Sequence, residues 1–229
     1  FSDFMDFPDL GRTHLKFDPL PPVNVPYFDK HRRIFDAISK KDVMVHHPYQ
    51  SFDYVIRFLR EAAIDPDVKS IKITLYRVAK ISSVVNSLIT AKMNGKEVTA
   101  MVEIQARFDE ETNIYWAGKL QEVGAKVIFG QPGQKVHCKM LMVSRIEKGR
   151  IREYAHLSTG NYNGFTARIY CDDGTGLPMA GLLLYTAAPD SEGTLGGLVS
   201  QGDPARLGAL VRQALDSMQL CTSDPLCGE

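Results

Sequence analysis

The stretch 135–163 carries an imidazole, an ammonium group and two amides at spacings that suit binding and attack of a phosphoryl group. His137 and Lys139 are two positions apart, so on a strand their side chains point to the same face, and Asn161 and Asn163 repeat this spacing. A neutral imidazole nitrogen is a nucleophile, while lysine and asparagine side chains donate hydrogen bonds to phosphate oxygens. A single histidine on a strand is more often structural. The combination of all four residues favours a phosphate-handling site.

Two arginines extend this site in the predicted topology. Arg77 and Arg107 each lie just past the carboxyl end of a predicted strand, which is where ligands of open α/β sheets bind. One such arginine is usually solvated or ion-paired. Two of them on the sheet that carries His137 and Lys139 look like a phosphate clamp, because guanidinium is planar, always charged and bidentate.

Alternating and helical patterns predict the elements that position these residues. Strands are expected over 42–48, 70–76, 98–104, 125–129, 151–157 and around His137, and helices over 52–63, 83–94 and 110–123. Ser51 is expected to cap the first helix, and Ile114, Ala117 and Leu120 to face the core from the third. This order predicts an α/β layered domain with a mixed, largely parallel sheet and helices on its faces.

Charge and cysteine content limit the function classes. The chain of 229 residues has 27 basic and 27 acidic residues, so net charge indicates neither a nucleic-acid nor a membrane partner. We expect no transmembrane segment and no signal peptide. Four scattered cysteines do not make a disulfide framework, which favours a reducing cytoplasm, with peripheral membrane association as an alternative.

Five motifs in order resemble bacterial polyphosphate kinase: HHPYQSFD, ITLYRVAK, EIQARFDEE, KVHCKM and LSTGNYNGFTARIY. The resemblance runs from residue 1 to about 172 and implies a phospholipase D-like fold. It implies that His137 is phosphorylated by ATP and passes the phosphate to polyphosphate. Arg77 and Arg107 match arginines linked to magnesium, and Tyr170 matches a nucleotide-contacting tyrosine. An arginine cannot coordinate a cation, so we interpret the two as binding phosphates that carry Mg²⁺.

The resemblance also implies partners and boundaries. ATP or ADP and inorganic polyphosphate are the expected substrates, Mg²⁺ the expected cofactor, and a homo-oligomer the expected state of the full-length family. We expect a lead-in segment over 1–41 and a catalytic domain over 42–172, in which His46 and His47 are weak candidates for the active-site rim.

The segment 173–229 differs from the rest in charge and in resemblance. It holds two basic and seven acidic residues, and it resembles a C-terminal domain of unknown function found in bacterial helicase-like proteins, which suggests a chimera. We expect a small α/β segment here whose GTLGGL stretch has no obvious sheet partner. Cys221 and Cys227 match part of a four-cysteine zinc site, but two ligands do not close a structural zinc site.

Two other functions fit the same residues. The basic pocket could bind polyphosphate or nucleotide without turnover, because the family enzyme is far longer than this chain. A phospholipase D-like phosphodiesterase is a further alternative, although that chemistry uses two H-x-K sets with acidic partners.

Overall fold

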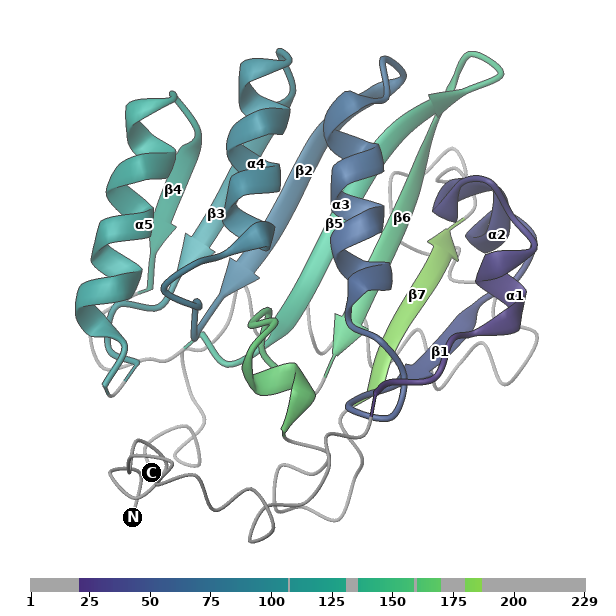
Figure 1. Cartoon of the computed structure of the whole chain (residues 1–229). Helices are drawn as coiled ribbons and strands as arrows, with labels where there is room; N and C mark the ends of the chain where they lie inside the picture. Colours follow the sequence, from purple (N-terminus) through teal and green to yellow (C-terminus); the bar gives the residue numbers. More distant parts are fainter. Residues whose placement is uncertain (1–20, 107, 131–135, 159, 170–179, 187–229) are drawn as a thin grey trace, which may run out of the picture.

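A seven-stranded mixed sheet organises the computed structural model, which describes residues 21–106, 108–130, 136–158, 160–169 and 180–186. The sheet order is β1-β7-β6-β5-β2-β3-β4 (Figure 1). The strands are β1 (Val43–His46), β2 (Val68–Leu75), β3 (Glu97–Val102), β4 (Lys126–Phe129), β5 (Lys139–Glu147), β6 (Arg150–Ser158) and β7 (Ala180–Thr186). Helices α3 (Asp53–Ile64), α4 (Ser83–Met93) and α5 (Glu110–Glu122) lie side by side on one face.

The expected α/β fold with a mixed sheet is confirmed, but its parallel part is smaller than predicted. Only β2, β3 and β4 pair in parallel, each joined to the next by a helix. The described pairings of β5, β6, β7 and β1 are antiparallel. For β5 and β6 the physical reason is the tight turn at Lys148 and Gly149, which returns β5 directly into β6 without a crossover helix.

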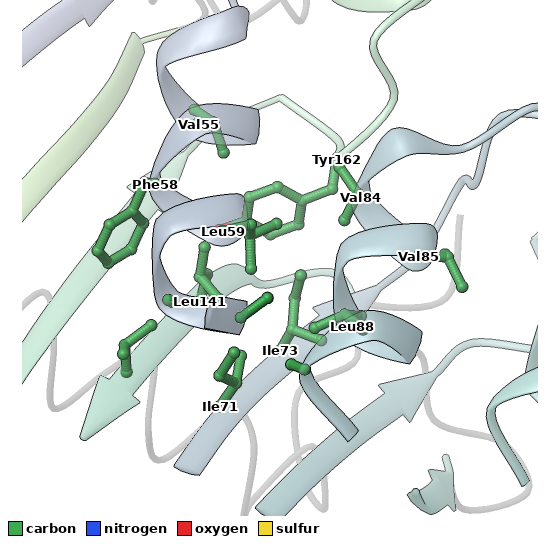
Figure 2. Close-up of a cluster of buried hydrophobic side chains, with 14 of the residues drawn as sticks. Val55, Phe58, Leu59, Ile71, Ile73, Val84, Val85, Leu88, Leu141 and Tyr162 are labelled. Carbon is green, nitrogen blue, oxygen red and sulfur yellow. The ribbon is translucent and has the colours of Figure 1, made fainter. Parts of the chain in front are cut away.

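One hydrophobic core joins the helices to the sheet. Figure 2 shows Ile71 and Ile73 of β2 and Leu141 of β5 beneath Leu59 of α3 and Leu88 of α4. All five belong to one buried cluster. The alternation along β2 and the helical stripe along α3 therefore meet as their spacing predicted.

The inward face of α5 differs from the prediction. Ile114 is 56% exposed, while Asn113 takes the inward position with no exposed surface. Ala117 and Leu120 are buried as expected. A polar residue replaces the expected apolar one because the ends of β2 and β3 present backbone groups that need hydrogen-bond partners, which Asn113 supplies.

The flanking segments share this core and sheet. The short helices α1 (Pro26–Asp29) and α2 (Ile34–Ile38) bury Phe28, Ile34 and Phe35 in the same cluster. Strand β7, which follows residue 172, pairs with both β1 and β6. The sequence analysis did not predict a strand at 180–186. The GTLGGL stretch and both C-terminal cysteines lie outside the described residues.

Candidate active site

The strand ends nearest the described candidate residues meet at one edge of the sheet, the lower edge in Figure 1. Strands β2, β3 and β6 end at this edge, and the antiparallel β5 begins there. His137 and Lys139 therefore lie near the segment that follows β2, which contains Arg77, and near the loop that follows β6, which contains Asn161. The predicted convergence of strand ends thus has a topological basis.

His137 and Lys139 contact each other directly. The Lys139 Nζ lies 3.0 Å from each ring nitrogen of His137. His137 precedes the first residue of β5 and is exposed, whereas Lys139 begins the strand and is only 5% exposed. An ammonium group can only donate, so of the two ring nitrogens it hydrogen-bonds to the one that carries the lone pair of the neutral imidazole. The pair thus presents an accessible imidazole beside a fixed positive charge.

Arg77 lies just past β2 and forms an ion pair that the sequence did not indicate. Its Nη1 is 2.6 Å from Oδ2 of Asp109, and both side chains are partly exposed. Its guanidinium carbon also lies 5.7 Å from the ring centroid of Tyr76. Arg107, the second predicted clamp residue, lies outside the described residues, as does Tyr170.

The two asparagines after β6 have different surroundings. The Asn163 Oδ1 accepts hydrogen bonds from the backbone N–H groups of Phe165 and Thr166, at 3.0 and 3.2 Å. These bonds hold the turn that leads into a short 3₁₀ helix, Thr166–Arg168, and leave the Asn163 amide N–H₂ as the group that could donate to a phosphate. The Asn161 Oδ1 is buried and accepts no hydrogen bond from the described residues.

Three buried polar residues hold the strand ends in place, and sequence reasoning missed all three. Thr74 Oγ1 donates to the carbonyl of Cys138 at 2.5 Å and accepts from the Met140 N–H at 2.9 Å. The backbone on both sides of Lys139 is therefore tied to β2. In the sequence Thr74 is only a strand threonine, so nothing in its immediate neighbours signals this role.

Glu103 and Asn113 complete this support. The Glu103 carboxylate accepts the Gln105 N–H at 2.7 Å and the Val136 N–H at 2.8 Å, which fixes the residue before His137. The Asn113 Nδ2 donates to the carbonyls of Tyr76 at 2.7 Å and Glu103 at 2.8 Å. Both side chains are almost fully buried, so the residues before the nucleophile candidate and after β2 are positioned by satisfied internal hydrogen bonds.

Sequence comparison assigns the chain to a family. Residues 33–177 match the family described as polyphosphate kinase C-terminal domain 1. This chain belongs to the polyphosphate kinase family. The polyphosphate kinases of Yersinia pestis and Escherichia coli K12 are each 50% identical to it, over 172 and 174 residues. These alignments cover 75% of this chain and 25% of each relative, so the chain spans about a quarter of their length.

A solved polyphosphate kinase structure agrees with this assignment. The crystal structure of polyphosphate kinase from Porphyromonas gingivalis is similar at a TM-score of 0.65 and 34% identity, over 79% of this chain and 26% of that one. A phospholipase D family member, Nuc from Salmonella typhimurium, has a TM-score of 0.48 at 12% identity, over 78% of this chain and 94% of that one. The predicted membership in the polyphosphate kinase family is thus confirmed.

In this polyphosphate kinase-family chain the neighbouring histidines His46 and His47 differ in burial. His47 is 1% exposed and its Nδ1–H donates to the Gln50 carbonyl at 2.9 Å. Burial lowers the pKa of His47, against the effect of that hydrogen bond, and the nearby His46 lowers it further. His46 is half-buried and its ring contacts that of Tyr49 at 5.0 Å. Both are packing residues, which fits the expectation for most loop and core histidines.

A further histidine, His156, is also buried in the core. Its Nδ1 lies 2.9 Å from the hydroxyl of Tyr162, and that hydroxyl donates to the His156 carbonyl at 3.2 Å, so Nδ1 must carry the proton. Burial first, and then the proximity of His47, lower the pKa of His156 to about 3. Burial also raises the pKa of Tyr162. This pair is neutral at neutral pH.

The described residues do not form a magnesium cage. Nowhere in the described ranges do three or more histidine, cysteine or acidic side chains cluster as metal ligands. Both Glu103 oxygens accept backbone N–H groups, and Asp109 faces Arg77. Within the same ranges, no helix is both long and apolar enough to cross a membrane.

Proposed function

We propose that this chain is a catalytic core that transfers the terminal phosphate of ATP, reversibly, to polyphosphate through a phosphohistidine at His137. The proposal depends on one observation above all: the exposed His137 ring lies 3.0 Å from the buried ammonium of Lys139. A lysine held there can bind a phosphate oxygen while the imidazole reaches phosphorus. Membership in the polyphosphate kinase family supplies the substrate class.

The proposed chemistry has two displacement steps. A ring nitrogen lone pair of His137 attacks the terminal phosphorus of ATP, the bond from phosphorus to the bridging oxygen breaks, and ADP leaves with that electron pair. A terminal oxygen of polyphosphate then attacks the phosphohistidine, and the imidazole leaves as the neutral nucleophile. In phosphoryl transfer, positioning and charge stabilisation supply most of the catalysis.

The neighbouring side chains have supporting roles in this proposal. Lys139 and Arg77 stabilise the phosphoryl oxygens, and the amide groups of Asn161 and Asn163 donate to the same anion. Arg77 must share its guanidinium between Asp109 and the phosphate, which the fork geometry allows because it carries five N–H donors. Arg107 and Tyr170 are assigned to phosphate and nucleotide contact by family resemblance alone. Mg²⁺ arrives with the nucleotide as part of the substrate.

A second function uses the cations of the same site. Lys139 and Arg77 both lie against the Tyr76 ring, and they could bind polyphosphate or nucleotide without turnover. The same cations would then give salt-sensitive binding that Arg77→Ala weakens. A cytoplasmic location and a homo-oligomer in the full-length context are compatible with either function.

The deciding experiment is labelling with terminally labelled Mg·ATP. Acid-labile, base-stable protein phosphate is expected on the wild type and on a His31→Ala control, which removes a half-buried histidine between α1 and α2. It should be absent from His137→Ala. Unchanged labelling of His137→Ala would refute the assigned nucleophile. If the folded wild type takes no label but still binds polyphosphate, the binding function is correct instead.

A further inference from the structure

Tyr76 contacts three side chains of the candidate site, namely those of His137, Lys139 and Arg77. Its ring centroid lies 5.0 Å from that of His137, with the two planes 76° apart. The same centroid is 5.4 Å from the Lys139 Nζ and 5.7 Å from the guanidinium carbon of Arg77. The motif analysis gave this tyrosine no role, and the chemistry proposed above does not use it.

The backbone holds Tyr76 firmly. The residue follows β2 directly, and its carbonyl accepts a hydrogen bond from the fully buried Asn113 at 2.7 Å. Asn113 Oδ1 also accepts the N–H of Val78 at 3.3 Å, so the chain is tied on both sides of Arg77. A half-buried ring on such a support has little freedom to move away from its contacts.

The uncharged Tyr76 ring is suited to positioning neighbouring side chains rather than to making or breaking bonds. A perpendicular aromatic contact restricts rotation of the imidazole, and the ring face attracts cations within about 6 Å of its centroid. The ring offers these contacts without a charge that would compete with an anionic phosphate for Lys139 or Arg77. The contacts involve the ring and not the phenol oxygen, so phenylalanine should serve equally well.

We propose that Tyr76 is a positioning residue that holds the His137 imidazole ready for attack and keeps Lys139 and Arg77 beside it. This inference rests on the proposed phosphoryl transfer, but the orientation of the ring can be measured without turnover. Losing one aromatic contact and two cation–π contacts should slow His137 phosphorylation about ten- to hundredfold.

The test compares Tyr76→Leu with Tyr76→Phe, and uses Tyr115→Leu as a matched control, since Tyr115 is 56% exposed on α5. Three readouts are taken on the full chain: the labelling rate against pH, the ATP concentration for half-maximal rate, and the NMR shift of the His137 ring protons without nucleotide. Tyr76→Phe and the control should match the wild type in all three. Tyr76→Leu should lose rate at unchanged half-saturation and shift the His137 ring signals. If the Tyr76→Leu variant does not fold, the Tyr76→Met variant is measured in its place.

Two results would overturn the proposal. An equal loss in Tyr76→Phe and Tyr76→Leu would make the hydroxyl the working group. Wild-type rates and unchanged His137 signals in Tyr76→Leu would show that the ring positions nothing. If the wild type itself takes no label, the proposed phosphoryl transfer fails, and the NMR comparison still decides whether Tyr76 orients the imidazole.

Discussion

The Thr74→Val substitution tests the hydrogen bonds that support the site, because it leaves the side chains assigned to the chemistry unchanged. The pairing of β2 with β5 runs to Ile73 opposite Leu141. Beyond that point the Thr74 hydroxyl, rather than the backbone, connects the strands through its bonds to Cys138 and Met140. Valine keeps the shape of the side chain and removes both hydrogen bonds.

The expected cost follows from the groups left unpaired. Thr74 is 2% exposed, so the Cys138 carbonyl and the Met140 N–H would lose their partner in a buried setting, at about 1–3 kcal/mol each. The better strand propensity of valine offsets a little of this. We expect the free energy of unfolding to fall by about 2–4 kcal/mol. A domain of ordinary stability remains folded after a loss of this size.

The measurement is urea unfolding together with the His137 labelling rate, both at a temperature where every variant is folded. Thr74→Ser is the control, because it keeps the hydroxyl and loses one methyl group, worth about 1 kcal/mol. The reasoning predicts a lower labelling rate in Thr74→Val and near wild-type labelling in Thr74→Ser. An unfolding free energy within about 0.5 kcal/mol of the wild type in Thr74→Val would refute it, since two buried backbone groups cannot lose their partner at no cost.

Three other changes test the buried polar groups. Asn113→Leu leaves the carbonyls of two residues and one N–H unpaired, so unfolding in urea should show a loss of at least about 3 kcal/mol; a neutral result would contradict the assigned bonds. Burial alone would raise the pKa of Asp65, but hydrogen bonds from the Asp67 N–H, Arg145 and Arg33 outweigh it and lower the pKa. Wild-type stability should therefore fall as pH drops below about 4, and Asp65→Asn should be less stable at pH 7 but lose less on acidification; parallel pH profiles would argue against this. Native His156 stays neutral while its unfolded form binds a proton below about pH 6.5, so wild-type stability should fall by up to about 1.4 kcal/mol per pH unit from there toward pH 4. His156→Gln should flatten that slope in thermal unfolding measured across the range, and an unchanged slope would show that another group titrates.

The elements with clear periodicity were predictable. The alternation in β2 and the stripe in α3 reflect one buried face each, and the Asn94-Gly95 turn has the positive φ of 78° that glycine tolerates. The strand ends that carry His137 and Arg77 followed from the same topology.

What the sequence did not reveal are partners far apart in the chain. Arg77 and Asp109 are 32 residues apart, and Glu103 and Val136 are 33 apart. Each residue looks like an ordinary surface or strand residue in its own neighbourhood. No local spacing rule pairs them, because the pairing depends on the order of strands in the sheet. Asn113 was missed for the same reason: its helix position predicts an apolar side chain, and only the β2 and β3 ends explain an amide.

These long-range contacts determine how the site is built. The side chains of His137 and Arg77 lie on segments outside regular strands, where the backbone has no ladder hydrogen bonds to hold it. Thr74, Glu103 and Asn113 supply those hydrogen bonds instead, from positions that are almost fully buried. Buried hydrogen bonds are worth most where water cannot replace them. A site assembled in this way can expose an imidazole to an anionic substrate and still keep its backbone rigid, which a nucleophile on an unsupported loop could not do.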